Sequence, residues 1–250
     1  MAMTSTAPVS RVWADPLLPN GPVPGLTQRV IELLRVEKER DLVVDLHCRD
    51  VQFPQAIPEE IRLRAQTTAL TPFSERLAFR LVTSGVRVVQ MSTLTFGRFP
   101  MRYGHVVLRD GFSLLKGSLR RLLPAVLSRL DPAGRVLIVD SAPSPDAPLF
   151  AKGLRRWNRQ HRSPEVIAEL MREVGFSAQV ETVEYVRRVP AAECYTWVKS
   201  RDWPILESFH EAELQRGLRE LRARYRSQHT VEFTSRFDLV LGTKPEALAS

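Results

Sequence analysis

The stretch from Tyr103 to Asp140 constrains the fold of this chain more than any other part of the sequence. An apolar run at 106–108 leads into polar residues, and a second apolar run at 136–139 ends at Asp140. Between them lies a segment with helical spacing, whose apolar residues are Leu119, Leu122, Leu123, Val126, Leu127 and Leu130. Residues 131–134 (DPAG) are expected to end that helix. The pattern predicts two parallel strands, buried on both faces of a sheet and joined by a crossover helix.

The size of the chain fits one domain. It has 250 residues, of which 44% are hydrophobic, and this is enough for a single α/β domain with a full core. Residues 1–25 hold several prolines and no periodicity, so we expect an N-terminal arm there. The domain itself is then expected to span 26–250.

Cysteine content, apolar runs and net charge limit where the protein is expected to be located and which partners it is expected to bind. The two cysteines, Cys48 and Cys194, give no disulfide framework, which favours a reducing cytoplasm. No apolar run has the length of a membrane span, and the N-terminus does not resemble a signal peptide. A chain with a net charge of +8 could bind nucleic acid or anionic metabolites, although a solvated basic surface is the favoured interpretation. No aromatic stacking motif supports RNA binding, so a nucleic-acid partner rests on charge alone.

Several segments resemble the class I S-adenosylmethionine-dependent methyltransferases of the small-molecule type. LDPAGRVLIVD, at 130–140, is similar to the L-x-P-G-G-x-L-x-x-x-D segment that leads into the fifth strand of that family. RSPEVIAELMREVGF, at 162–176, resembles the helix and glycine before its sixth strand. YTWVKSR, at 195–201, and GTKP, at 242–245, are similar to its insert and its closing segment. The resemblance covers about residues 25–245 and is strongest from 103 onward.

This resemblance implies a Rossmann-like, doubly wound, seven-stranded and mostly parallel α/β sheet. The last strand, within 231–241, should be antiparallel and lie beside the 136–139 strand. The other strands are expected at 42–46, near 60–70 with its polar end at 66–68, at 86–91 and at 178–188, after an opening helix at 25–40. A helical lid is implied within 143–162 and 191–226.

The turn after the first strand departs most from the family pattern. Asp45 stands where the family has an acid, whereas His47, Arg49 and Val51 stand where it has glycines. These side chains would occupy space in which backbone amides approach the cofactor, so S-adenosylmethionine binds in an altered way or no longer binds. The resemblance implies a cofactor site made of Asp45, His47, Arg49, Thr67, Thr93 and Arg109. A metal site at 47–50 is not expected, because a second source of ligands is missing.

Candidates for the chemistry and for the acceptor can also be named. Asp110, His47 and His105 are the candidate proton acceptors, although His105 fits a core histidine better and Asp110 could instead cap a helix. The expected acceptor-binding residues of the lid are Arg156, Trp157, Tyr195, Trp197 and Arg201. A packed Trp157 with a solvated basic face is an equally weighted alternative.

Two functions remain open at this point. The first is an enzyme that transfers a methyl group from S-adenosylmethionine to a small-molecule acceptor in specialised metabolism. The second is a pseudo-methyltransferase that lacks the cofactor and acts as scaffold, as activating partner of a catalytic subunit, or as a repurposed cyclase or isomerase. A homodimer, or a heteromer with a catalytic methyltransferase, is compatible with either function.

Overall fold

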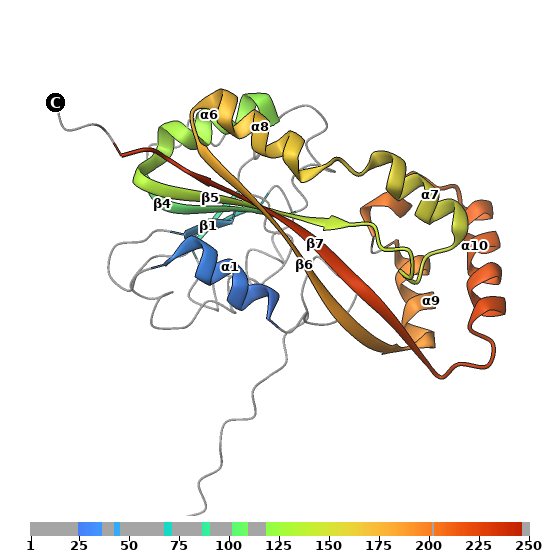
Figure 1. Ribbon diagram of the computed structural model, residues 1–250. Coiled ribbons are helices and arrows are strands. Elements are labelled where there is room, and N and C mark those ends of the chain that lie inside the picture. The colour runs from blue at the N-terminus through green and yellow to red at the C-terminus, as the bar shows by residue number, and fades with distance from the viewer. Residues whose placement is uncertain are drawn as a thin grey trace, which may run out of the picture.

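The computed structural model describes residues 25–36, 43–45, 68–71, 87–90, 102–109, 119–201 and 203–246, with the backbone alone for the three short segments at 43–45, 68–71 and 87–90. The strands are β1 (Val43–Asp45), β2 (Thr68–Thr71), β3 (Arg87–Gln90), β4 (Tyr103–Arg109), β5 (Leu130–Ala142), β6 (Ser177–Pro190) and β7 (Thr230–Thr243). They form one seven-stranded sheet in the order β3-β2-β1-β4-β5-β7-β6 (Figure 1).

The direction of each strand follows the sequence prediction. Strands β3, β2, β1, β4 and β5 pair in parallel, and β7 pairs antiparallel with both β5 and β6. The predicted antiparallel last strand, inserted beside residues 136–139, is therefore confirmed, because Leu137 pairs with Leu241 and Val139 with Leu239. All carboxyl ends of the parallel strands consequently meet at one edge of the sheet.

The unit from Tyr103 to Asp140 is the centre of this sheet. Helix α6 (Leu119–Arg129) connects β4 to β5, and every residue of β4 is buried. On one side of the sheet a core cluster includes residues of α6, α8 (Pro164–Val174), β4 and β5. On the other side a second cluster joins α1 (Leu26–Leu34) to β4, β5 and β7. The predicted burial of the central strands on both faces is confirmed.

Two element boundaries differ from the prediction. Strand β5 begins at Leu130, so residues 131–134 do not form the expected helix-ending turn but an early part of the strand. Lys244 holds this start, because its backbone N–H donates to the Gly134 carbonyl at 2.9 Å and its ammonium to the Leu130 carbonyl at 2.6 Å. Helix α1 ends at Leu34 with Arg35 in a left-handed conformation, earlier than the predicted end at residue 40.

The second strand, expected near 60–70, is described at Thr68–Thr71. β2 starts at Thr68, where the expected strand had its polar end, and its carboxyl end is Thr71. The register fixes this assignment, since Val44 pairs with Thr68 and Asp45 with Ala69. Thr67 itself lies outside the described residues.

Helix α8 shows how local signals set boundaries. Ser163 is its N-cap and accepts a hydrogen bond from the Glu165 N–H at 3.3 Å, with Pro164 at the first helical position. Gly175 ends the helix with φ of 110°, a conformation that glycine adopts without strain. Both boundaries agree with the prediction from the sequence.

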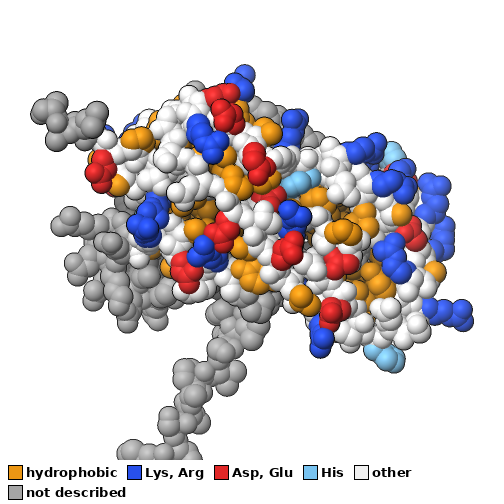
Figure 2. Space-filling model, viewed as in Figure 1, with side chains coloured by type: hydrophobic (Ala, Val, Ile, Leu, Met, Phe, Trp, Pro, Cys, Tyr) orange, Lys and Arg blue, Asp and Glu red, His pale blue; other side chains and the backbone are white. Residues whose placement is uncertain are grey.

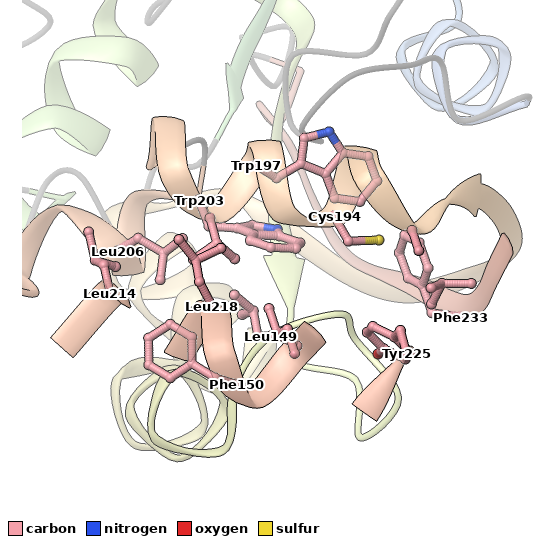
Figure 3. Close-up of a cluster of buried hydrophobic side chains, with 14 of the residues drawn as sticks. Leu149, Phe150, Cys194, Trp197, Trp203, Leu206, Leu214, Leu218, Tyr225 and Phe233 are labelled. Carbon is pink, nitrogen blue, oxygen red and sulfur yellow. The ribbon is translucent and has the colours of Figure 1, made fainter. Parts of the chain in front are cut away.

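A block of helices lies beyond the end of β5 (Figure 1). It comprises α7 (Ala151–Gln160), α9 (Ala191–Ser200), the 3₁₀ helix η2 (Pro204–Ser208) and α10 (Glu211–Arg224). A third apolar cluster fills it and includes Leu149, Phe150, Cys194, Trp197, Trp203, Leu206, Leu214, Leu218, Tyr225 and Phe233 (Figure 3). The segments at 143–162 and 191–226, where the lid was expected, therefore fold into one packed unit.

The thiol inside this block is expected to be inert in the folded protein. Cys194 is fully buried, and burial raises the pKa of its thiol to about 12. In a Cys48→Ser variant, the thiol of Cys194 should react with a thiol-specific chromogenic reagent at pH 8 about 1000-fold more slowly in the folded than in the unfolded state, because so little thiolate is present. Rapid labelling without denaturant would contradict the packing of α9.

Candidate functional site

The carboxyl edge of the parallel strands carries two of the predicted cofactor residues. Asp45 is the last residue of β1 and pairs with Val107, and Arg109 is the last residue of β4. Arg109 is buried, with 4% of its surface exposed. Ligands of open α/β sheets bind in the crevice at this edge. The other predicted residues of this region, His47, Arg49, Thr67, Thr93 and Asp110, lie outside the described residues.

His105 occupies a different level of the sheet. It pairs with Val43, the first residue of β1, and with Arg135, and only 6% of its surface is exposed. It stands four residues before Arg109, which places it about 13 Å from the carboxyl edge at the usual rise of a strand. The structure therefore places His105 in the buried part of β4, away from the carboxyl edge.

Strands β6 and β7 continue past this edge. The last pair between β5 and β7 is Ala142 with Arg236, and beyond it residues 230–235 pair only with 185–190. We call these paired segments the extension. One face of the extension, here called its inner face, is largely buried and carries Tyr185, Arg187, Val189, Val231, Phe233 and Ser235. The inner face thus begins where β5 ends, beyond the level of Asp45 and Arg109.

Trp197 packs against this inner face from α9. Its ring is fully buried and lies edge-on to Trp203 at 5.7 Å and to Phe233 at 6.1 Å between ring centroids. The guanidinium of Arg187 lies 5.7 Å from the centroids of both the Trp197 and Phe233 rings. The indole nitrogen points away from the labelled apolar side chains (Figure 3), and it has no hydrogen-bond partner among the described residues. The ring is a core element, and only its N–H is left for other contacts.

Two further predicted acceptor residues lie at the margin of the third apolar cluster. Trp157 of α7 and Tyr195 of α9 are half-buried, and both pack against the third apolar cluster, to which Trp197 belongs. The structure therefore brings together the aromatic residues of the two predicted lid segments. The guanidinium of Arg222 lies 5.8 Å from the Tyr195 ring centroid.

The two remaining predicted residues, Arg156 and Arg201, make contacts within the helical block. The guanidinium of Arg156 lies 4.6 Å over the Phe209 ring and donates to the Ser208 carbonyl at 3.4 Å. Arg201 donates to the Phe209 carbonyl at 2.6 Å and pairs with Glu211 at 3.4 Å. These contacts tie α7 and α9 to η2 and the start of α10, which is a structural role.

The sequence analysis did not predict a partly buried pair of a histidine and a carboxylate. His161, between α7 and α8, lies 3.0 Å from Asp238 of β7, and the Thr182 hydroxyl donates to the other carboxylate oxygen at 2.8 Å. Burial alone would raise the pKa of Asp238, but the hydrogen bonds from His161 and Thr182 outweigh it and leave that pKa below its usual value. Asp238 lies opposite Asp140 of β5. The pair fixes the α7–α8 connection to the sheet, and residues 77 positions apart gave no local signal for it.

The surface of the helical block is basic. Lys and Arg side chains gather over α7 and α10 (Figure 2), and exposed members of this group are Lys152, Arg155, Arg159, Arg216 and Arg219. Acidic residues are interleaved, as Glu213 contacts Lys152 and Glu220 pairs with Arg224. Within the described ranges, no helix is long and apolar enough to cross a membrane, and no three metal-binding side chains gather in one place.

Comparison with known proteins identifies the fold. No family model and no curated sequence matches the chain. Among solved structures it is similar to phosphoethanolamine N-methyltransferase 2 from Haemonchus contortus, with S-adenosylhomocysteine bound, at 13% identity and a TM-score of 0.54 over 89% of this chain and 53% of that one. The YcgJ protein from Bacillus subtilis matches at 14% identity and a TM-score of 0.55, over 88% and 98% of the two chains. The [4+2]-cyclase SpnF matches at 15% identity and a TM-score of 0.54, over 89% and 81%.

These likenesses extend over most of this chain but not of every neighbour. The chain spans about half the length of the Haemonchus enzyme. At 13–15% identity they concern the arrangement of helices and strands. Together with the strand order and the inserted antiparallel β7, they show that this chain has the fold of the class I S-adenosylmethionine-dependent methyltransferases.

Proposed function

We propose that this chain transfers a methyl group from S-adenosylmethionine to a small-molecule acceptor. The observation that carries the proposal is the sheet itself, with β7 inserted antiparallel between β5 and β6 and the helical block beyond the carboxyl edge. Neighbours with this fold include an N-methyltransferase of a small phosphorylated amine. The sequence resemblance to small-molecule methyltransferases supports the same reaction and a role in specialised metabolism.

At the carboxyl edge of the sheet, two described residues stand where the family resemblance implies contacts with the cofactor. Asp45 ends β1 beside β4, at the position where the resembling family has an acid, and Arg109 ends β4. The cofactor would supply an electrophilic methyl group on a sulfonium centre. The chain would hold the acceptor in line with that methyl group, because positioning supplies much of the rate of such transfers. The helical block is proposed as the lid that orients the acceptor and excludes water.

The glycine-free turn supports a second function. With His47, Arg49 and Val51 in place of glycines, the chain could keep the fold without the cofactor and act as partner of a catalytic methyltransferase, or as a cyclase or isomerase. One neighbour with this fold is a [4+2]-cyclase, which supports the repurposed form of this alternative.

Calorimetry with S-adenosylmethionine and S-adenosylhomocysteine tests the proposal. We expect both to bind the isolated chain with a dissociation constant in the millimolar range. The side chains of His47, Arg49 and Val51 restrict the backbone of the turn.

A glycine variant sharpens this test. The combined change His47→Gly, Arg49→Gly and Val51→Gly should tighten binding at least about tenfold, whereas Arg188→Gln, on the exposed face of β6, should leave it unchanged. Low-micromolar binding by the unaltered chain would contradict the expected steric effect and leave methyl transfer standing. Absence of binding in both the chain and its glycine variant would overturn methyl transfer and favour the second function.

A further inference from the structure

We propose that strand β6 pairs with β6 of a second copy of this chain, in a two-fold arrangement that joins the two sheets into one. The contact would lie along the side of β6 that faces away from β7, here called the open edge. The paired segment would be residues 182–190, with Val186 at the two-fold axis. The inference is separate from methyl transfer, because β6 lies at the sheet edge opposite β3 and carries none of the predicted cofactor residues.

Strand β6 forms one edge of the described sheet (Figure 1). It has 14 residues, and among the described strands it pairs with β7 alone. The edge of a sheet presents a row of N–H and C=O groups that another strand can bind, and natural proteins shorten or cover such edges. Strands in globular proteins mostly have about 5–6 residues. An edge strand of this length therefore calls for an explanation.

The hydrogen bonds of β7 show which backbone groups of β6 point to the open edge. The Thr234 N–H donates to the Asp146 carboxylate at 2.8 Å, and Asp146 follows the end of β5, so this N–H points away from β6. Thr234 lies opposite Val186. Opposite residues of an antiparallel pair either exchange both hydrogen bonds or turn both pairs of groups away from each other. The N–H and C=O of Val186 therefore face the open edge, as do those of every second residue along β6.

These outward groups have a defined middle stretch. The carbonyl of Ala178, at one end, accepts a hydrogen bond from the Arg172 side chain at 3.1 Å. Pro190, at the other end, has no N–H to donate. Between them, the outward N–H and C=O groups of residues 180–188 make no hydrogen bond to any residue in the part of the chain that the structure describes. A second strand would satisfy them.

The side chains beside the open edge complement themselves under a two-fold rotation. Glu184, Val186 and Arg188 lie on one face of β6, here called its outer face, and all are exposed. Val186 has 70% of its surface exposed, which is unusual for a large apolar side chain in a strand. In an antiparallel pair centred on Val186, Glu184 of each copy lies opposite Arg188 of the other. Two ion pairs then flank a contact between the two valines.

Strand β7 extends this pattern of charges. Arg236 lies opposite Glu184, and Glu232 lies opposite Arg188 and pairs with it. A row of four side chains across β7, β6 and the same two strands of the second copy would therefore alternate in sign at every step. Charges on an edge strand commonly prevent pairing with another edge. Here the same charges attract when the edge meets its own copy.

Neighbouring registers lack this match. Opposite residues must turn their backbone groups the same way, so moving the two-fold axis by one residue moves the pairing by two. An axis at Glu184 would place two carboxylates against each other, and an axis at Arg187 two guanidinium groups. An axis at Tyr185 would place Glu184 opposite Val186. Like charges directly opposite each other destabilise a sheet, so the sequence of β6 selects the axis at Val186.

Sedimentation velocity of the full chain measures this association. We expect a reversible dimer with a dissociation constant of about 10 μM, because the paired stretch is smaller than a standard protein interface. Arg188→Glu or Glu184→Arg alone brings like charges together on both sides of the axis and should weaken the dimer at least about tenfold. Arg216→Glu, the same change on the exposed surface of α10, should have no effect.

Mixing the two charge variants tests the register. A chain with Glu184→Arg presents two arginines, and a chain with Arg188→Glu presents two glutamates, so each fits the other but not itself. An equimolar mixture should form a heterodimer about as stable as the unaltered dimer, although neither variant associates alone. A fluorescent label on one variant reports the heterodimer during sedimentation.

A cysteine at the axis gives a second measurement. In Val186→Cys, combined with Cys48→Ser, the two Cα atoms at 186 would lie about 5.5 Å apart, within the reach of a disulfide. Mild oxidation should therefore link two copies, while Cys194 is buried and does not take part. Thr234→Cys is the matched control on the next strand. Its position lies three strand spacings, or about 14 Å, from its copy and should not cross-link.

The outcomes decide between a second copy and other partners. A chain that stays monomeric at about 100 μM would overturn the proposal and leave the open edge to a strand of another protein. A dimer that persists in both charge variants and does not cross-link at 186 would place the interface elsewhere and equally overturn it. None of these measurements uses S-adenosylmethionine, so their result is independent of whether methyl transfer is confirmed.

Discussion

Replacing Asp238 by alanine is expected to lower the free energy of unfolding by about 3 kcal/mol at pH 7. Asp238 is 2% exposed, and its two oxygens bind His161 and Thr182. The alanine variant would leave both partners without their acceptor and would free the α7–α8 connection from the sheet. Urea unfolding, followed by circular dichroism, measures the change. A loss below about 0.5 kcal/mol, typical of exposed sites, would show that the pair does not form.

The same carboxylate should give a distinct pH dependence. The folded pKa of Asp238 is below its usual value, so its stabilisation is fully present above the unfolded pKa, near 3.9, and is lost as the pH falls through the folded pKa. The stability difference between the unaltered chain and Asp238→Asn should shrink as the pH falls below about pH 4. Glu232→Gln, on the exposed side of the same strand, serves as control and should change stability by less than about 0.5 kcal/mol.

Replacing Gly217 by alanine is expected to destabilise the helical block by about 2 kcal/mol. A Cβ at this position in α10 would lie 2.3–2.7 Å from ring atoms of Phe150, far inside van der Waals contact. Phe150 is 2% exposed and packs edge-on against Phe209 at 5.2 Å, so its ring has no free space to move into. This strain exceeds the gain of up to about 1 kcal/mol that alanine brings to a helix interior.

Gly153 provides the matched control. It lies on α7 against the same Phe150 ring, but a Cβ there would be 3.6–3.7 Å from the ring atoms, an ordinary contact. Gly153→Ala should therefore be neutral or raise the stability by up to about 1 kcal/mol. Thermal unfolding of both variants tests the packing of α7 against α10. Equal effects of the two changes would contradict the close approach of Gly217 to Phe150.

Predictions from sequence succeeded where a signal is local. Ser163, Pro164 and Gly175 mark both ends of α8 by capping and backbone preferences that act within a few residues. The apolar runs at 106–108 and 136–139 mark strands that are buried on both faces. At β2 the predicted range of 60–70 overlaps the strand, but the polar residues 66–68 were wrongly taken as its end, which is Thr71. The position of a short strand is set by its pairing with β1, which no local pattern records.

In the candidate site, too, the sequence placed some residues correctly and could not place others. The sequence placed Asp45 and Arg109 at strand ends, and the structure brings them to one edge because parallel strands share their direction. It could not separate Trp197, whose ring is core, from Arg201, whose donors hold the helical block together. Nothing in the sequence distinguishes Arg187 from the many other arginines of the chain. Only the structure shows that it lies opposite Phe233 and is buried.

The sequence by itself indicated the crossover unit at 103–140 and the two ends of α8, because apolar periodicity and caps depend on neighbouring residues. The antiparallel direction of the last strand was an expectation from the family resemblance, which the pairing of β7 with β5 confirms. Only the tertiary structure decided that His161 meets Asp238 and that Arg187 lies against the rings of Trp197 and Phe233. Burial and hydrogen bonding are properties of contacts between distant segments, and a polar residue looks the same in sequence whether water or another strand covers it.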